Sequence, residues 1–357
     1  MNRNRKLIFY SLIFISSFGF SVSTGSIETI WSTSSFGDDD FFHRPSDMEV
    51  DSERALFYVA DSGNHRILVF DFQGKLLRII GRKGQGPAEF SKPTGLHILE
   101  DGGLAVADVG NRRIQIFGKD GKFVKSIKSK SVQVADMIFI DNKIYSISAF
   151  GSSRYRFDMH LEKDTQPLVN ILNNQGNLIQ SISVDNFPES HPYLRALKHR
   201  VCLALSRDGK LYIPHFAMNV IHVFDLEGNK ISEFRRPLPF KPMSPKLVTQ
   251  RRINSEVIEM GANLDYVTRE ASFGADGYLY LLTYTQSNEE RGKQEPEKEN
   301  RPPHPMRIEV IDPKTYKVLK YISCDPGTLT FALIGDNNLV YIYEDNEGEI
   351  TLKCIKY

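Results

Sequence analysis

The sequence predicts an all-β fold, a six-bladed β-propeller, and a repeated segment is the first observation behind this prediction. Asp61-Ser-Gly-Asn-His-Arg-Ile67 and Asp108-Val-Gly-Asn-Arg-Arg-Ile114 lie 47 residues apart, and each leads through a turn to a short apolar strand. A repeat of about 40 to 50 residues that holds several short strands is typical of a propeller blade. Apolar residues make up 41% of the chain and aromatic residues 11%, enough for the core of one large all-β domain.

The second observation is that short apolar runs, separated by Gly, Asp and Asn turns, recur along the whole chain. They divide it into six blades, each with an inner strand at the channel and an outer strand at the rim. The blades are expected at Asp47–Ile80, Thr94–Ile127, Val134–Val184, Val201–Phe234, Thr268–Ile322 and Leu329–Ile355.

The third observation concerns the last blade, which has room for only three strands before the chain ends. Ile27–Trp31 is a strand-like segment that stands alone ahead of the first blade. We expect it to supply the outer strand of the last blade, because joining the two chain ends closes the ring and removes open sheet edges.

Three segments depart from the bare blade pattern. Insertions are expected around Phe150–Gln166 in the third blade and at Thr285–Pro305 in the fifth, the latter rich in Glu, Lys, Pro and Asn. Between the fourth and fifth blades, Leu247–Met260 has apolar residues at loosely helical spacing, which predicts a short helix over one face of the disc.

The first residues have the order of a secretory signal peptide. Arg3, Arg5 and Lys6 precede an apolar stretch, Leu7–Phe20, and small residues follow it. We therefore expect a leader at 1–25, a propeller at 26–357, and a protein exported to the periplasm or the medium, with an uncleaved N-terminal anchor as the alternative. The apolar stretch is short for a membrane span, and the first Cys is Cys202, far from the leader, so stable membrane insertion and a lipid anchor are not expected.

The three cysteines are too few for a disulfide scaffold. Cys202 and Cys354 lie in apolar strand patterns and are interpreted as core residues. Cys324 and Cys354 fall in adjacent blades, so a disulfide between them and two buried free thiols are both open.

The repeated Asp-x-Gly-Asn-x-Arg-Ile motif occupies the turn between the second and third strands of a blade. Gly and Asn suit positive backbone angles there, and the Asp carboxylate can accept backbone N–H groups. A structural role is expected for the polar residues of both copies, with a contribution to the rim of a ligand site as the alternative. These residues are Asp61, Asn64, Arg66, Asp108, Asn111 and Arg113.

This motif resembles the NHL repeat, and the connection Ile80–Phe90 followed by Lys92-Pro93 is similar to the loop that joins successive NHL blades. The chain as a whole resembles exported six-bladed NHL-type propellers of Bacteroidota. The resemblance implies the fold and leaves the activity open, because this fold carries both enzymes and binding modules.

Some relatives of such propellers are metalloenzymes, so the resemblance leaves a metal site open. An amidating-lyase-like zinc site implies three converging His, whereas His97, His215 and His222 do not follow the Pro residues that begin the blades. A lactonase-like calcium site implies axial oxygen ligands, and nothing in the spacing of Asn142, Asn219, Asp136 and Glu256 singles them out. Asp38-Asp39-Asp40 lacks the ligand spacing of a calcium loop and is interpreted as a solvated turn. No catalytic residue, metal ligand or cofactor is assigned, and calcium or zinc remains the alternative.

Basic residues gather in the first two blades, where the motif turns and the connections between blades emerge on one face. The candidate ligand-binding residues are His65, Arg66, Arg82, Lys83, Arg112 and Arg113. The formal charge is +1, and without the three basic residues of the leader 42 Lys and Arg face 44 Asp and Glu, so nucleic acid is not expected as a partner. We expect a monomeric module that binds a protein, peptide or glycan on this face, with a metal-dependent hydrolase or lyase acting from the central channel as the alternative.

Overall fold

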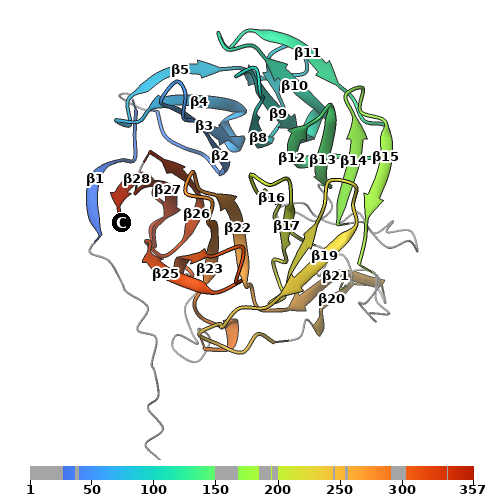
Figure 1. Ribbon diagram of the computed structural model, residues 1–357, viewed down its shortest axis with the longest axis vertical. Coiled ribbons are helices and arrows are strands. Elements are labelled where there is room, and N and C mark those ends of the chain that lie inside the picture. The colour runs from blue at the N-terminus through green and yellow to red at the C-terminus, as the bar shows by residue number, and fades with distance from the viewer. Residues whose placement is uncertain are drawn as a thin grey trace, which may run out of the picture.

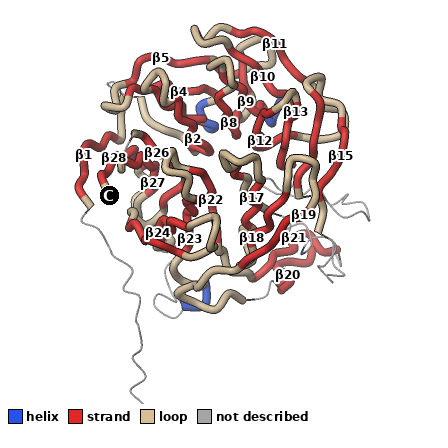
Figure 2. Tube along the Cα trace, viewed as in Figure 1, coloured by secondary structure: helices blue, strands red, loops and turns tan. Residues whose placement is uncertain are grey.

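The protein forms a ring of six four-stranded antiparallel sheets around a central channel (Figure 1). The computed structural model describes residues 27–36, 40–148, 168–184, 194, 200–243, 246–253, 256–290, 303–335 and 337–357. Its elements are almost all strands, joined by turns and loops, with single 3-10 turns, η1 (Ser62–Asn64) and η2 (Val109–Asn111), in the two motif copies (Figure 2). The predicted six-bladed propeller is confirmed.

The first three blades follow one another along the chain, each running from the channel to the rim. Blade 1 consists of β2 (Pro45–Asp51), β3 (Leu56–Asp61), β4 (Arg66–Asp71) and β5 (Leu76–Ile80). Blade 2 consists of β8 (Pro93–Ile98), β9 (Leu104–Asp108), β10 (Arg113–Phe117) and β11 (Phe123–Ile127). Blade 3 consists of β12 (Val134–Ile140), β13 (Lys143–Ser148), β14 (Val169–Asn173) and β15 (Leu178–Ile182). Between the first two blades, β6 (Arg82–Lys83) and β7 (Glu89–Phe90) form a small parallel pair.

The second half of the ring repeats this order and ends with the strand that closes it. Blade 4 consists of β16 (Ala204–Leu205), β17 (Leu211–Pro214), β18 (Ile221–Phe224) and β19 (Lys230–Phe234). Blade 5 consists of β22 (Thr268–Phe273), β23 (Leu279–Tyr284), β24 (Met306–Ile311) and β25 (Val318–Ser323). Blade 6 consists of β26 (Thr328–Ile334), β27 (Asn338–Glu344), β28 (Ile350–Lys356) and β1 (Glu28–Thr33).

The core is a circle of apolar clusters, one between each pair of neighbouring blades. Every residue of β9, β17 and β23, the second strands of blades 2, 4 and 5, is buried, whereas β15 exposes four of its five residues at the rim. Because each cluster needs both neighbours, no blade can bury its faces alone, and the stability of the disc depends on a closed ring.

The ring is closed by the N-terminal strand, as the sequence predicted. β1 pairs antiparallel with β28 and forms the outer edge of the last blade. Trp31 fixes it to blade 1: its indole N–H donates to the Phe72 carbonyl at 3.1 Å, and its ring is stacked on Phe57 with centroids 6.2 Å apart. Gly74 makes room for the indole, since a Cβ there would lie 2.8 Å from the Trp31 ring.

The repeated motif has the structural role expected of it. The Asp61 carboxylate accepts the His43 backbone N–H at 2.7 Å, the Asn64 amide at 2.9 Å and Arg66 Nε at 2.9 Å. In the second copy, Asp108 accepts the corresponding groups of Ser91, Asn111 and Arg113 at 2.7 to 2.8 Å. Each fully buried Asp therefore ties the motif turn to the connection that begins its own blade.

The helix predicted at Leu247–Met260 is wrong. This segment is a two-stranded hairpin, β20 (Lys246–Ile253) paired with β21 (Glu256–Asn263), outside the six blades. The apolar residues that suggested a helix include several β-branched ones, which lose side-chain freedom in helices and favour strands.

All three cysteines are free thiols, so the alternative of a Cys324–Cys354 disulfide is not realised. Cys354 packs in the cluster between blades 6 and 1, and Cys324 packs against the cluster between blades 5 and 6. The expected leader, the insertion at 150–166 and most of the 285–305 insertion lie outside the described residues. Within the described ranges, no helix has the length and apolar character needed to cross a membrane.

Candidate functional site

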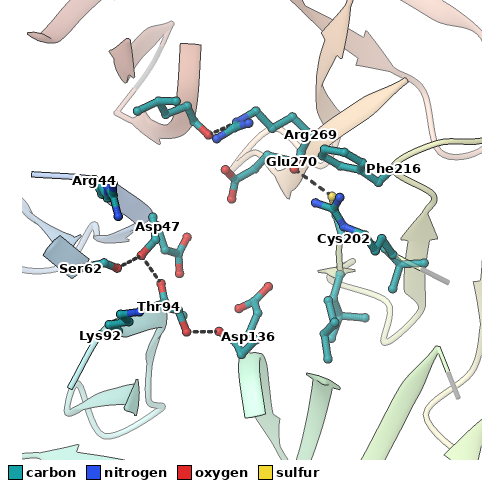
Figure 3. Close-up of a pocket in the computed structure, with 18 of the residues that line it drawn as sticks. Arg44, Asp47, Ser62, Lys92, Thr94, Asp136, Cys202, Phe216, Arg269 and Glu270 are labelled. Atoms are coloured by element: carbon teal, nitrogen blue, oxygen red, sulfur yellow. Dashed lines mark hydrogen bonds between the residues drawn. The ribbon is translucent and has the colours of Figure 1, made fainter. Parts of the chain in front are cut away.

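A cavity of about 460 Å³ opens at one mouth of the central channel, on the face where the motif turns meet the connections between blades. The inner strands and the segments that precede them form its walls (Figure 3). Its charged and titratable lining residues are His43, Arg44, Asp47, His65, Lys92, Asp136, Arg200, Cys202, Arg269 and Glu270.

Three carboxylates occupy equivalent positions on the inner strands of alternate blades. In β2, β12 and β22 the pairing with the second strand shifts register just before Asp47, Asp136 and Glu270, respectively. Such an irregularity redirects the side chain that follows it. Figure 3 shows all three carboxylates directed into the same cavity. We call these three residues the carboxylate tier.

The same position is occupied differently in two other blades. In β26 the corresponding register shift precedes Thr330, whose fully buried hydroxyl interacts with the Glu270 carboxyl. In β8 the shift spans Gly95, where a Cβ would lie 2.7 Å from the Asp136 Cα. Glycine here lets β12 approach β8 closely and leaves space for the Asp136 side chain.

Backbone groups hold two of the carboxylates in place. Asp47 accepts the N–H of Met48 at 2.8 Å and that of Leu96, from the neighbouring blade, at 2.6 Å. Asp136 accepts the N–H of Met137 at 2.7 Å. In the part of the chain that the structure describes, no ion pair joins Asp47, Asp136 or Glu270 to a basic side chain.

The environment favours the protonated form of these groups. Burial, followed by the charges of Asp136, Glu270 and Glu49, raises the pKa of Asp47 well above its usual range. Burial raises the pKa of Asp136 to about 6. Burial raises the pKa of Glu270 to about 8; a hydrogen bond with Thr330 and the charge of Arg269 oppose the shift, and the nearby carboxylates Asp136 and Glu49 add to it. The groups face the open channel, yet protein surrounds it on every side, so their charge is poorly solvated.

A further titratable pair lies deeper along the same strands. Glu49 follows Asp47 by two residues on β2, and its Oε1 lies 3.6 Å from His97 Nδ1 on β8. Burial raises the pKa of Glu49 to about 7 and lowers that of His97 to about 4. His97 is also stacked on Phe139 of β12, with ring centroids 6.1 Å apart. The channel therefore holds a column of weakly solvated acid groups below the cavity.

Cationic side chains occupy the outer level of the cavity. Arg44, Lys92 and Arg200 stand in equivalent positions, each directly before the first paired residue of its blade's inner strand. We call these three residues the cation tier. Arg44 and Lys92 both precede a Pro and have left-handed backbones, with φ of 53° and 57°. A non-glycine residue in this conformation costs about 1 kcal/mol or more, and such strain is common at functional sites.

Arg200 is the most buried cation of the cavity, with 7% of its surface exposed. Its guanidinium carbon lies 3.9 Å from the centroid of the Phe216 ring, while its Nε has no hydrogen-bond partner. Burial lowers its pKa to about 10. Arg269 lies between the tiers, donating from Nε to the Leu329 carbonyl at 2.6 Å and from Nη1 to the Tyr284 hydroxyl at 3.3 Å.

The cavity offers poor conditions for a nucleophile. Burial raises the pKa of the Cys202 thiol, which donates to the Arg269 carbonyl at 3.1 Å. The hydroxyls of Ser46 and Ser62 are 2.7 Å apart and also bond to carbonyls of blade 2. These groups are engaged in holding the wall together.

The structure separates the candidate residues predicted from the sequence. His65 lines the cavity with φ of 58°, and its Nδ1 accepts the Lys92 backbone N–H at 3.0 Å. Arg66 and Arg113 are bound within their motif turns. The other candidates, Arg82, Lys83 and Arg112, are exposed outside the described lining of the cavity, and Arg82 pairs with Glu89 at 2.9 Å.

Sequence reasoning missed most of this site. Asp136 is one of several possible calcium ligands in the sequence analysis, and it lines the cavity. Cys202 packs against the core cluster between blades 4 and 5, as predicted, and also lines the cavity. The detectable signal was the repeated pair Arg44-Pro45 and Lys92-Pro93, which places a cation at the start of two blades. His215 and His222 pack on each other in blade 4, with centroids 5.1 Å apart and outside the described lining. Among the described residues, no group of three or more His, Cys, Asp and Glu is arranged to hold a metal ion.

These features define a closed six-bladed β-propeller with a two-level charged cavity at one mouth of its channel. The chain belongs to the DUF5128 family, described as a 6-bladed beta-propeller, whose model matches residues 38–296. Among curated proteins, none matches this sequence.

Solved structures share the fold at low sequence identity. A DUF4221 family member from Bacteroides vulgatus aligns with a TM-score of 0.59 and 9% identity over 93% of this chain and 98% of that one. Virginiamycin B lyase from Staphylococcus aureus aligns with a TM-score of 0.51 and 11% identity over 93% and 100% of the chains. A luciferin-regenerating enzyme aligns with a TM-score of 0.51 and 12% identity over 93% and 95%. At these identities the similarity shows the fold alone.

Proposed function

We propose that this protein is an exported NHL-type propeller that binds a short peptide, carrying charges of both signs, in the cavity at the mouth of its channel. Export is proposed from the leader-like residues 1–25, and a periplasmic or extracellular location follows from it. The sequence predicted a protein, peptide or glycan as the partner. The proposal specifies a short peptide, which is small enough to enter the cavity.

The observation that carries the proposal is the Arg200 guanidinium. It is almost completely buried in the cavity wall, and its Nε lacks a hydrogen-bond partner. A buried charged donor without an acceptor is costly, and an anionic group of a ligand would satisfy it. Arg200 therefore favours a ligand with a carboxylate.

The carboxylate tier favours a ligand that also carries a positive charge. Asp136 lies close enough to raise the pKa of Asp47 and of Glu270, and none of the three carboxylates forms an ion pair with a basic side chain among the described residues. A cationic group between them would relieve both the desolvation and the mutual repulsion. A volume of about 460 Å³ lies in the range of pockets for small ligands and suits a peptide of a few residues.

The alternative is a metal-dependent hydrolase or lyase acting from the channel, and the axial carboxylates are the observation in its favour. Their arrangement lends it less support, since the described residues contain no group of three ligands placed for a metal ion. Binding of stoichiometric zinc or calcium, measured by elemental mass spectrometry of the purified protein, would favour this alternative.

The test compares the cavity with the outer basic face by isothermal titration calorimetry, using trialanine as the probe. Arg200→Met keeps an unbranched side chain over Phe216 but removes the charge, so we expect binding to weaken at least about 10-fold. Arg82→Gln and Arg112→Gln alter exposed residues outside the cavity and serve as matched controls, expected to bind within about twofold of the wild type.

If Arg82→Gln or Arg112→Gln lost binding and Arg200→Met kept the affinity of the wild type, the ligand would lie on the outer face. A wild-type protein that binds neither trialanine nor any other member of a panel of short peptides would refute the proposed function.

A further inference from the structure

We propose that the cavity recognises the amino terminus of a peptide. The free α-ammonium group enters the cavity first and lies among Asp47, Asp136 and Glu270, and the peptide carboxylate lies at Arg200. This inference rests on the proposed function and specifies which end of the ligand faces the channel.

The first argument is the match in number and direction of hydrogen-bonding groups. The three carboxylates come from blades 1, 3 and 5 and converge from different sides of the channel (Figure 3). An ammonium group has three N–H donors and no acceptor. Each donor can therefore face one carboxylate, in charge-assisted hydrogen bonds that are roughly twice as strong as neutral ones.

The second argument is that an unpartnered polar group lies at the outer end of the proposed ligand. Arg200, with 7% of its surface exposed, has a free Nε at the outer level. Buried polar groups are normally satisfied, so this one is explained by a ligand whose anionic end accepts from it.

The third argument is the separation of the two tiers along the strands. Arg44 precedes Asp47 by three residues on the way into the channel. Arg200 holds the equivalent position in blade 4, so in the backbone the cation tier stands about three residues outside the carboxylate tier. A tripeptide with one charged end at each tier suits this spacing better than a free amino acid does.

Alternative ligands fit less well. A neutral or acidic sugar could accept from Arg200 and donate hydroxyls to the carboxylates, but it would leave their mutual repulsion in place. A metal ion holds its oxygen ligands at about 2.0 to 2.6 Å, closer than an ammonium group does, and no group of three ligands in the described part of the chain is placed to hold one. The aliphatic lining residues of the cavity, such as Ile147, Leu203 and Ala271, suit a peptide with small apolar side chains.

The experiment compares matched probes on the unmodified mature protein by isothermal titration calorimetry at pH 7.5. Trialanine carries both end charges, N-acetyltrialanine lacks the ammonium, and trialanine amide lacks the carboxylate. We expect acetylation to weaken binding by about 10- to 100-fold and amidation to weaken it by a comparable factor.

A second measurement is the number of protons released when the peptide binds. In buffers of different ionisation enthalpy at pH 6.5, trialanine should release up to about one proton from the carboxylate tier on binding, and N-acetyltrialanine should release none. The other titratable groups facing the tier are Glu49 and His97 below it and Cys202 and Arg269 beside it. Asp136→Asn should reduce both the affinity and the proton release, with the exposed Asp120→Asn as its control.

The outcomes separate this inference from the proposed function. If trialanine and N-acetyltrialanine bound with equal affinity, recognition of the amino terminus would be refuted, while the proposal of peptide binding would stand. Tighter binding of Nα-acetyl-lysine than of trialanine would also refute recognition of the amino terminus, because a side-chain ammonium would then be the recognised group. Absence of binding by all of these probes and by the wider peptide panel would refute the proposed function itself.

Discussion

Replacing Glu270 by Gln should make the ligand-free protein more stable at pH 8, although it removes a native charge. Glu270 keeps its proton to a pKa of about 8 in the folded protein, against an ordinary value of 4.5, mainly because it is buried. A group of this kind contributes stability that is fully present below its unfolded pKa and is lost as the pH rises through its folded pKa. Gln mimics the protonated carboxyl and has no proton to lose.

The magnitude follows from the size of this shift. At about 1.4 kcal/mol per pH unit, the wild type loses roughly 4 kcal/mol between pH 4 and pH 8 through this one group. In a domain of more than 300 residues, 1 kcal/mol corresponds to roughly 2 °C in Tm, so the difference between variant and wild type should reach roughly 8 °C.

The assay is differential scanning calorimetry of both proteins from pH 4.5 to pH 8.5, with the exposed Glu227→Gln as the control variant. The wild type and the control should lose stability in parallel as the pH rises from about 4.5 to about 8, while Glu270→Gln should lose less. A Glu270→Gln protein whose Tm stays below that of the wild type at pH 8, or falls in parallel with it, would refute the account of the carboxylate tier.

Two further predictions concern the ring and its turns. Deletion of residues 26–32 should expose the edge of β28 and cause aggregation, and the milder Trp31→Ala should lower the unfolding free energy by roughly 3 kcal/mol in urea denaturation. Unchanged melting of either protein would contradict closure by β1. Asp108→Ala should cost roughly 3 to 5 kcal/mol because it leaves Arg113 buried and unpaired, whereas Asp120→Ala, in an exposed turn, should stay within about 0.5 kcal/mol. Equal losses in the two Asp variants would contradict the role of the motif.

The fold could be predicted from the sequence because its signals are local and repeated. The alternation of short apolar runs, the two motif copies and the isolated Ile27–Trp31 segment each constrain the same architecture, and their agreement determines six blades and the closing strand. The prediction failed at Leu247–Met260, where there is no repeat and a weak helical spacing competes with β-branched composition.

The site was only partly predictable, for a physical reason. Asp47, Asp136 and Glu270 become equivalent through register shifts between paired strands, and a register shift leaves little trace in one sequence. His65 was predicted because it lies beside basic residues that the motif turns and blade connections place on one face. Arg200 was missed because it lies before a blade that lacks a clear copy of the motif, and its burial depends on packing against Phe216.

The most direct test of the central claim is a crystal structure of the mature protein with trialanine at pH 7.5. We predict that the peptide occupies the channel mouth, with its ammonium nitrogen about 3 Å from carboxylate oxygens of Asp47, Asp136 and Glu270 and its carboxylate against Arg200. A peptide bound elsewhere, such as beside Arg82 and Arg112, with the channel mouth empty at a saturating concentration, would contradict the account.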